Sequence, residues 1–173
     1  NQTVFEVYKI DTPIEANATN ITYGENEIIN VTVDESATGY IAVRVGTDIH
    51  VLPVVNGTAK FNISGLAAGN YTALVVYVGD AIYNNATTTV SFKVGPTENY
   101  ILDVKVDDIE YGQNATIRVL VPVLSGNVTI NVDGKIIETV NVTNGTAVLV
   151  VPGLAGGVHY VNVTYNGNDM LAP

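Results

Sequence analysis

Apolar and polar side chains alternate along much of the chain. Every second residue is apolar in 59–63 and again in 73–77, and a Gly-containing stretch separates the two segments. A period of two residues is typical of a β-strand that buries one face. The pattern over residues 56–79 therefore predicts two strands joined by a turn.

Residues 144–167 repeat this pattern 88 positions further along the chain. The matching positions are Asn56/Asn144, Gly65/Gly153, Leu66/Leu154, Gly69/Gly157, Tyr77/Tyr165 and Gly79/Gly167. Self-similarity at a fixed period indicates tandem repeats, and a strand pair with one apolar face needs a second sheet to cover it. We therefore expect two domains, each of them a β-sandwich.

Further alternating segments complete the repeats. They lie at 29–33, 40–45, 49–55 and 87–94 in the first repeat, and at 117–121, 128–132 and 136–142 in the second. These segments are rich in Val, Ile, Thr and Tyr, which predicts an all-β fold with about seven strands per domain. Gly95-Pro96 is typical of a linker, so we expect domains at 11–95 and 96–173, preceded by a separate segment 1–10.

The second repeat lacks a closing strand of its own. Residues 87–94 supply it in the first repeat, and the matching strand would fall at about 175–182, beyond Pro173. Residues 3–10 have the pattern of such a strand, and they align best with 89–94 if one residue is slipped. A missing strand removes a stabilisation of about 10 kcal/mol, which is comparable to the whole stability of a small domain.

One end of the chain therefore lacks a strand, and the other has a strand to offer. We expect main-chain hydrogen bonds between the two ends of different copies, with alternate side chains selecting the register. The donor residues are Thr3, Val4, Phe5, Glu6, Val7, Tyr8, Lys9 and Ile10. The acceptor edge is Val158, His159, Tyr160, Val161, Asn162, Val163, Thr164 and Tyr165. A head-to-tail contact of this kind does not close on itself, so it predicts a filament.

Composition narrows the classes of function. Seven basic and seventeen acidic side chains give a formal net charge of −10, which argues against a nucleic-acid partner. The chain has no cysteine, so it offers neither a disulfide scaffold nor a thiolate metal site. No apolar run approaches the roughly 18 residues of a membrane span, and membrane insertion is not expected.

Asparagine carries a signal for the compartment. Thirteen of the 19 Asn residues begin an Asn-X-Ser/Thr triplet, whereas the 23 Ser and Thr residues in 173 would give about 2.5 by chance. The triplets begin at Asn1, Asn17, Asn20, Asn30, Asn56, Asn62, Asn70, Asn85, Asn114, Asn127, Asn141, Asn144 and Asn162. Thr-rich strands and Asn-Gly-Thr turns also produce such triplets. We interpret them as N-glycosylation sites, which predicts an extracellular protein at the cell surface.

The sequence contains little that predicts catalysis. His50 and His159 are the only histidines, and they occupy non-equivalent positions in the two repeats. Neither a Gly-x-Ser-x-Gly elbow nor a phosphate-binding loop is present. We therefore expect no enzyme and no catalytic cofactor.

One acidic stretch suits a calcium ion. Asp103, Asp107, Asp108 and Glu110 lie close together at the start of the second repeat, and calcium prefers oxygen ligands. The alternative is an acidic strand edge that is simply solvated. Calcium is the one metal that the sequence suggests.

Several short motifs carry a family resemblance. They are Tyr-Gly at 23–24 and 111–112, Val-Thr-Ile-Asn-Val-Asp-Gly-Lys at 128–135, Asn-Gly-Thr-Ala, Gly-Leu-Ala-x-Gly, and Tyr-x-Gly-(Asp/Asn) at 77–80 and 165–168. With these motifs the chain resembles the bacterial Ig-like group 3 repeats of long surface adhesin-like proteins, particularly those of methanogenic archaea. The resemblance covers both repeats. It implies two tandem Ig-like sandwiches that act as spacers or binding modules.

The two ends of the chain add a looser resemblance in plan, without a motif. Subunits of archaeal extracellular threads that assemble by donor-strand complementation are similar, with an incomplete sandwich and an extended N-terminal strand. Our leading hypothesis is therefore a glycosylated filament subunit whose partners are further copies of itself. The alternative is a segment of a long adhesin that acts as a spacer or binds a host or neighbouring cell surface.

Overall fold

The structure is a computed structural model that describes residues 1–173, apart from the side chain of Ile136. The chain divides into two compact units, Asn1–Gly95 and Pro96–Pro173, called domain 1 and domain 2 below. The described residues form fourteen strands and no helix, so the predicted all-β class is confirmed. None of them belongs to a helix that could cross a lipid bilayer.

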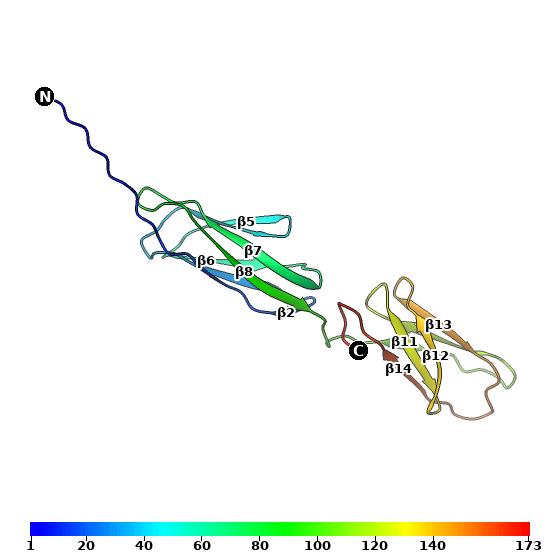
Figure 1. Cartoon of the computed structure of the whole chain (residues 1–173). Coiled ribbons are helices and arrows are strands. Elements are labelled where there is room, and N and C mark those ends of the chain that lie inside the picture. The colour runs from blue at the N-terminus through cyan, green and yellow to red at the C-terminus, as the bar shows by residue number, and fades with distance from the viewer. The chain divides into compact units, whose positions relative to one another are not determined.

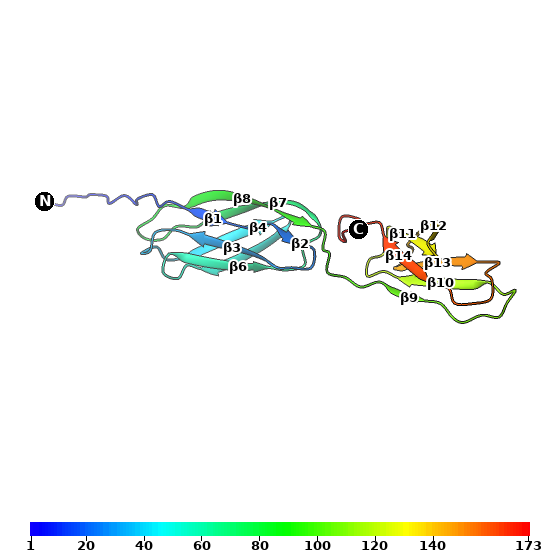
Figure 2. The same cartoon turned by 90° about the horizontal axis from the view of Figure 1, so that it is seen from below.

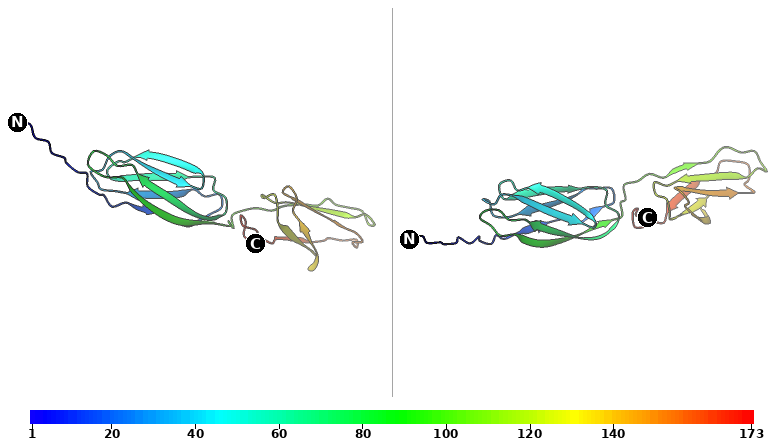
Figure 3. Two further views of the ribbon diagram at one scale, coloured as in Figure 1. Left: turned by 45° about the horizontal axis from the view of Figure 1, so that its top comes forward. Right: turned by 90° about the horizontal axis from the view of Figure 1, so that it is seen from above.

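Domain 1 contains eight strands in two sheets (Figures 1, 2 and 3). They are β1 Glu15–Asn17, β2 Ile21–Thr22, β3 Glu27–Thr32, β4 Tyr40–Val45, β5 Asp48–Pro53, β6 Thr58–Ile63, β7 Gly69–Tyr77 and β8 Ala86–Gly95. One sheet has the order β1-β3-β6, and the other has the order β2-β8-β7-β4-β5. All pairings are antiparallel except that of β2 with β8, which is parallel.

The core of domain 1 lies between these sheets because alternate side chains of each strand point inward. Phe61, Ile29 and Ile41 are among its fully buried side chains. Tyr77 is buried as well, and its hydroxyl donates a hydrogen bond to the carbonyl of Thr38 at 2.8 Å. Burial raises the pKa of Tyr77 to about 12, since the phenolate would lose its hydration.

Domain 2 contains six strands in two sheets of three (Figure 2). They are β9 Asp103–Lys105, β10 Ala115–Leu120, β11 Asn127–Val132, β12 Lys135–Asn141, β13 Thr146–Val151 and β14 Val161–Tyr165. The orders are β13-β10-β9 and β12-β11-β14. Tyr165 takes the place of Tyr77, and its hydroxyl donates to the carbonyl of Ser125 at 2.9 Å. The shared topology extends the repeat from sequence to structure.

A tight turn recurs at the same point in each domain. Asn56-Gly57 and Asn144-Gly145 both have positive φ at each residue, 50° and 68° in the first pair and 49° and 77° in the second. Two consecutive residues in the left-handed region are typical of a type I′ hairpin turn, for which Asn-Gly is the preferred pair. These turns connect β5 with β6 and β12 with β13.

The alternation in sequence misses a buried acidic residue. Glu27 opens β3 with its side chain inside the sandwich, where it is fully buried. Its Oε1 accepts a hydrogen bond from the backbone N–H of Thr19 at 3.0 Å. Ala115 holds the corresponding position in domain 2, so this acid belongs to domain 1 alone.

Candidate functional site

Strand β8 completes the sandwich of domain 1, so it is the reference for the comparison with domain 2. It lies between β7 and β2, as Figure 1 shows. On one side it is antiparallel to β7, from Gly69 opposite Val94 to Tyr77 opposite Ala86. On the other side its end runs parallel to β2, with Val94 opposite Ile21. Strand β8 is therefore an interior strand of its sheet.

The inward side chains of β8 fill the part of the core that lies beneath this strand. Phe92 and Val94 are 4% and 1% exposed. Leu66, Tyr71 and Ile21 pack against the same cluster. The contribution of such a pair is large, since burial of one Phe or Val side chain stabilises a domain by about 1.5–3 kcal/mol.

Domain 2 is open at the corresponding place. Strand β14 matches β7, because it pairs with β11 as β7 pairs with β4, but it forms the edge of its sheet. The described residues of domain 2 contain no counterpart of β8. The segment 109–110, which matches β2 by the 88-residue period, forms no strand either. We call the region between β14 and residues 106–111 the open slot.

A cavity of about 410 Å³ lies in this open slot. Its walls are residues 106–111 on one side, residues 154–159 and Val161 on the other, and core side chains such as Ile117 at the base. The repeat period relates Ile109, Leu154 and His159 to Ile21, Leu66 and Tyr71, which surround the side chains of β8 in domain 1. The cavity therefore occupies the place that Phe92 and Val94 fill in domain 1.

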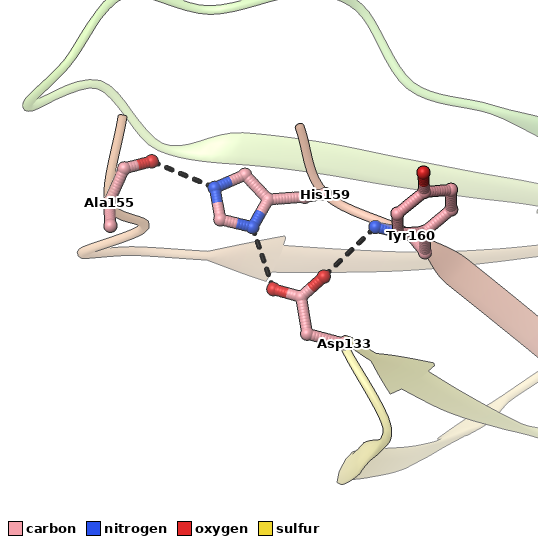
Figure 4. Close-up of polar contacts among 4 residues, drawn as sticks. All are labelled: Asp133, Ala155, His159 and Tyr160. Carbon is pink, nitrogen blue, oxygen red and sulfur yellow. Dashed lines mark hydrogen bonds and ion pairs between the residues drawn. The ribbon is translucent and has the colours of Figure 1, made fainter. Parts of the chain in front are cut away.

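His159 is held in a fixed orientation at the wall of the cavity (Figure 4). Its Nδ1 lies 2.7 Å from Oδ2 of Asp133, and its Nε2 lies 2.8 Å from the carbonyl oxygen of Ala155. The other oxygen of Asp133 accepts a hydrogen bond from the backbone N–H of Tyr160 at 3.0 Å. Both ring nitrogens face acceptors, which favours the protonated imidazolium.

The pKa values of this pair shift in the directions that the contacts require. The Ala155 carbonyl, and after it the Asp133 carboxylate, raises the pKa of His159 above its ordinary value of 6.5. The backbone N–H of Tyr160, and after it the His159 ring, lowers the pKa of Asp133 below 3.8. His159 thus joins the loop at Ala155 to the turn at Asp133, beside the open slot.

The acceptor edge proposed from sequence divides into two parts. Residues 161–165 form β14, whereas 158–160 lead into it without strand pairing. Val158 and Tyr160 are largely exposed, and the carbonyl of Tyr160 accepts a hydrogen bond from the N–H of Asp133 at 2.9 Å. The edge of β14 beside the cavity therefore starts at Val161, and the irregular segment from Val161 back to His159 continues along the cavity.

The proposed donor segment is extended and exposed, and only the backbone of its last residue pairs with domain 1. Residues 1–9 leave domain 1 as an extended chain with exposed side chains, drawn in blue in Figures 1 and 2. Phe5 is 84% exposed, in contrast to the buried Phe92. Ile10 is anchored: its N–H donates to the carbonyl of Ile82, and its carbonyl accepts from the N–H of Asn84. Ile10 thus belongs to domain 1, and the free segment is 1–9.

The anchor of Ile10 recurs at Thr97 in domain 2. The N–H of Thr97 donates to the carbonyl of Met170 at 2.8 Å, and its carbonyl accepts from the N–H of Ala172 at 2.9 Å. Ile10 and Thr97 are 87 residues apart, so the segments before them align at that offset. Phe5 then matches Phe92 and Val7 matches Val94, without the slipped residue that sequence comparison suggested.

The acidic stretch does not gather into a metal site. Among the described side chains, no group of three or more His, Asp or Glu could hold a metal ion. Asp103 instead lies 3.2 Å from Lys105 on the same strand, β9. Asp107, Asp108 and Glu110 line the cavity. The structure therefore gives the calcium interpretation no support.

The asparagines of the Asn-X-Ser/Thr triplets are almost all accessible. Twelve of the thirteen are exposed, and only Asn127 is half-buried. The Oδ1 of Asn127 accepts a hydrogen bond from Nδ2 of Asn166. Three of the sites, Asn17, Asn30 and Asn62, lie on the exposed face of the β1-β3-β6 sheet. Their exposure is compatible with modification in the folded chain.

Sequence reasoning missed two structural features that bear on the proposed strand donation. Asp133 follows β11 in a turn, at φ 56°, and only the fold brings it to His159. The anchor at Thr97 is made by backbone atoms, so no side-chain pattern could reveal it. By contrast, the repeat period of 88 residues is enough to relate the cavity residues Leu154 and His159 to Leu66 and Tyr71 beside β8.

Comparison with known proteins identifies several similar structures, all at low identity. The fibronectin(III)-like modules of Clostridium thermocellum CbhA are 17% identical, over 93% of this chain and 90% of theirs, with a TM-score of 0.37. A structure of a 1.5-MDa bacterial ice-binding adhesin is 14% identical, over 95% of this chain and 67% of that one, with a TM-score of 0.37. At these scores the likenesses carry no conclusion about function.

The β-glucuronidase of Parabacteroides merdae is also similar, at 12% identity and a TM-score of 0.39. The alignment covers 91% of this chain but only 23% of the glucuronidase. Among curated proteins, none is similar enough in sequence to count as a relative. Domain 1 does match a defined family: residues 14–95 match the bacterial Ig-like domain (group 3).

Proposed function

We propose that this chain is an extracellular, N-glycosylated structural subunit that joins copies head to tail. The free segment of one copy, residues 3–9, would enter the open slot of the next. One observation carries this proposal: the cavity in domain 2 occupies the place that Phe92 and Val94 of β8 fill in domain 1. Residues 3–7 present the same Phe-x-Val pattern, fully exposed.

The energetics favour occupation of the open slot. The donated strand would bury Phe5 and Val7 and add main-chain hydrogen bonds worth about 1 kcal/mol each. The acceptor gains a closed core, and the donor loses only the freedom of a segment that is already extended. Because donor and acceptor surfaces differ, each copy can join two others, which yields a filament instead of a closed pair.

The exposed asparagines support the extracellular setting. N-linked glycans at these positions would make the surface bulky and hydrophilic, while the open slot carries no such site at the positions that would contact a donor. Only Asn162 lies on β14 itself, with an exposed side chain. A strand can therefore approach the edge while glycans cover the outer faces.

The alternative is that the two domains are repeats of a longer surface adhesin. The match of residues 14–95 to a bacterial Ig-like domain family favours it, because domains of this kind can serve as the repeated modules of a longer array. In that case the strand beside β14 comes from the same polypeptide, and the module acts as a spacer or binds another cell surface. Both versions are non-catalytic, and in both a strand fills the same place beside β14.

Deletion of residues 1–9 separates the two versions. Electron microscopy and size-exclusion chromatography of the intact chain should reveal linear assemblies that the deletion variant does not form. A peptide of residues 1–10 added to the deletion variant should raise the melting temperature of domain 2. Filaments that persist after the deletion, or an intact chain that stays monomeric at high concentration, would contradict head-to-tail assembly.

A further inference from the structure

We propose that the open slot accepts its strand in one register, with Phe5 opposite His159, Val7 opposite Gly157 and Thr3 opposite Val161. The inference rests on the strand donation proposed above. It adds the register, a second line of backbone pairing and the residues that select the strand. The donated segment then becomes an interior strand, as β8 is, and not an added edge.

The register follows from the two anchors. Ile10 and Thr97 hold equivalent backbone positions, so Phe5 and Val7 correspond to Phe92 and Val94. In domain 1 these two residues lie opposite Tyr71 and Gly69.

The 88-residue period converts Tyr71 and Gly69 into His159 and Gly157, both of which line the cavity. The same transfer places Thr3 opposite Val161, because Val90 lies opposite Ala73. Each pair thus follows from an observed pairing in domain 1.

The other side of the slot offers a parallel partner. In domain 1 the end of β8 pairs with β2, Val94 with Ile21 and Gly95 with Thr22. The matching residues of domain 2 are Ile109 and Glu110, which line the cavity without strand pairing. A strand in the proposed register brings Val7 to Ile109 and Tyr8 to Glu110. Backbone pairing on both sides would fix the strand more firmly than an edge contact.

His159 suits an aromatic side chain in this position. The rings of Tyr71 and Phe92 stack with centroids 5.4 Å apart and an interplanar angle of 12°. Both nitrogens of His159 are engaged by Asp133 and Ala155, so these two contacts use the edge of the ring and not its faces, as Figure 4 shows. Phe5 can therefore stack on a ring that is already oriented, and this contact selects an aromatic residue at that position of the donor.

Asp108 offers the strand a backbone contact. In domain 1 the Oδ1 of Asn20 accepts a hydrogen bond from the N–H of Lys93 at 2.8 Å. The repeat period relates Asn20 to Asp108, and Lys93 corresponds to Glu6 in the donor. Asp108 lines the cavity, so its carboxylate is placed to accept from the N–H of Glu6.

Disulfide crosslinking tests the register, because the chain has no cysteine of its own. Residues directly opposite each other in adjacent strands lie about 4.5–5.5 Å apart, within the range of a disulfide, whereas diagonal neighbours lie about 7–8 Å apart. The test leaves Phe5 and His159 unchanged and uses Asn1, which the same transfer places opposite Val163 because Thr88 lies opposite Val75. Mixing Thr3→Cys chains with Val161→Cys chains, or Asn1→Cys with Val163→Cys, should give mixed disulfides under mild oxidation. The diagonal mixtures Thr3→Cys with Val163→Cys and Asn1→Cys with Val161→Cys should react much more slowly. Tyr71→Cys with Phe92→Cys in one chain calibrates the reaction.

The outcomes separate the two proposals. Preferential reaction of the diagonal mixtures would mean that a strand docks in another register, which overturns this inference alone. The absence of mixed disulfides from all four mixtures would contradict strand donation itself. Preference for the direct pairs supports both.

Binding of a peptide of residues 1–10 to the deletion variant tests the selecting side chains. Phe5→Ala in the peptide should weaken binding about a hundredfold, whereas Glu6→Ala should change it by less than about threefold. Asp108→Leu in the protein should weaken binding about tenfold, and Asp108→Asn should retain it, as Asn20 does in domain 1. Equal binding of the Phe5→Ala and unaltered peptides would overturn the inference.

Discussion

The ring of Phe92 stacks on the ring of Tyr71, with centroids 5.4 Å apart. This contact joins β8 to β7 and closes the core of domain 1. His159 holds the position of Tyr71 in domain 2, beside a cavity of about 410 Å³. Among the described residues, the second sandwich thus lacks the contact that closes the first.

Truncation of Phe92 should imitate the open form in domain 1. We expect Phe92→Ala to lower the free energy of unfolding of domain 1 by about 3–5 kcal/mol, because a large buried side chain is removed and a cavity remains. Chemical denaturation followed by tyrosine fluorescence measures the change. Lys93→Ala is the matched control, since its exposed side chain on the same strand should matter by less than about 0.5 kcal/mol. Equal effects of the two substitutions would contradict the role of Phe92 in closing the core.

A strand supplied in the same chain should close domain 2. The residues of β8, 86–95, can be appended after Pro173. Pro173 matches Asn85 by the 88-residue period, so the added strand would follow domain 2 as β8 follows Asn85 in domain 1. The gain in buried apolar surface and backbone pairing should raise the melting temperature of domain 2 by at least about 10 °C. Differential scanning calorimetry of the extended and intact chains gives the comparison. The same extension with Phe92 and Val94 replaced by Ser is the control, and an equal rise with it would refute the assignment of the cavity.

The stability of domain 2 should depend on pH through His159. Because the pKa of His159 is raised above 6.5 in the folded chain, its stabilisation is complete below pH 6.5 and is lost as the pH rises through the folded pKa. The pKa of Asp133 is lowered below 3.8, so its contribution is present above pH 3.8 and is lost as the pH falls through the folded pKa. Melting temperatures between pH 4 and 9 should therefore decline on the alkaline side.

His159→Gln should remove this alkaline decline in domain 2. His50→Gln, which changes the only other histidine, is the matched control and should leave the decline intact. A decline that survives the loss of His159 would assign the pH dependence to another group. The two substitutions together thus identify the titrating residue.

Asp80 should make domain 1 sensitive to acid. Its carboxylate accepts hydrogen bonds from the backbone N–H groups of Thr38, Tyr83 and Ile82, at 2.7–2.8 Å, and these bonds lower its pKa below 3.8. Its stabilisation is present above pH 3.8 and is lost as the pH falls through the folded pKa. The melting temperature of domain 1 should therefore fall steeply in acid.

Asn168 provides the comparison for Asp80, since it holds the corresponding position in domain 2. Its Oδ1 accepts from the N–H groups of Met170 and Leu171, both at 2.8 Å. Asp80→Asn should lower the stability of domain 1 at neutral pH, because the amide has a single oxygen and its NH₂ group cannot accept the hydrogen bonds of the second. The substitution should also flatten the response of domain 1 to acid. An unchanged acid response in this variant would exclude Asp80 as the source.

Glycan occupancy should follow the exposure of each asparagine. Asn127 and Asn141 lie directly opposite each other on β11 and β12, but only Asn141 is exposed, and Asn127 is bonded to Asn166. In material from the native source we expect a glycan on Asn141 and an unmodified Asn127. Mass spectrometry of glycopeptides measures both sites in one digest. Full occupancy of Asn127 would mean that modification precedes folding of this strand.

The local pattern of the chain determined much of the fold. Alternation predicted the strands around Ile41 and Val128, because a period of two is a property of neighbouring residues. The repeat period also related β14 to β7, since it compares one part of the sequence directly with another.

Only the tertiary structure decided which distant segments meet within each domain. The equivalence of Ile10 and Thr97 consists of backbone hydrogen bonds, which leave no trace in the side chains and which moved the alignment of the donor by one residue. The contact of Asp133 with His159, and the burial of Glu27, depend on segments that meet only when the two sheets pack. Sequence patterns report which faces are apolar, whereas the packing of distant segments decides which groups those faces enclose.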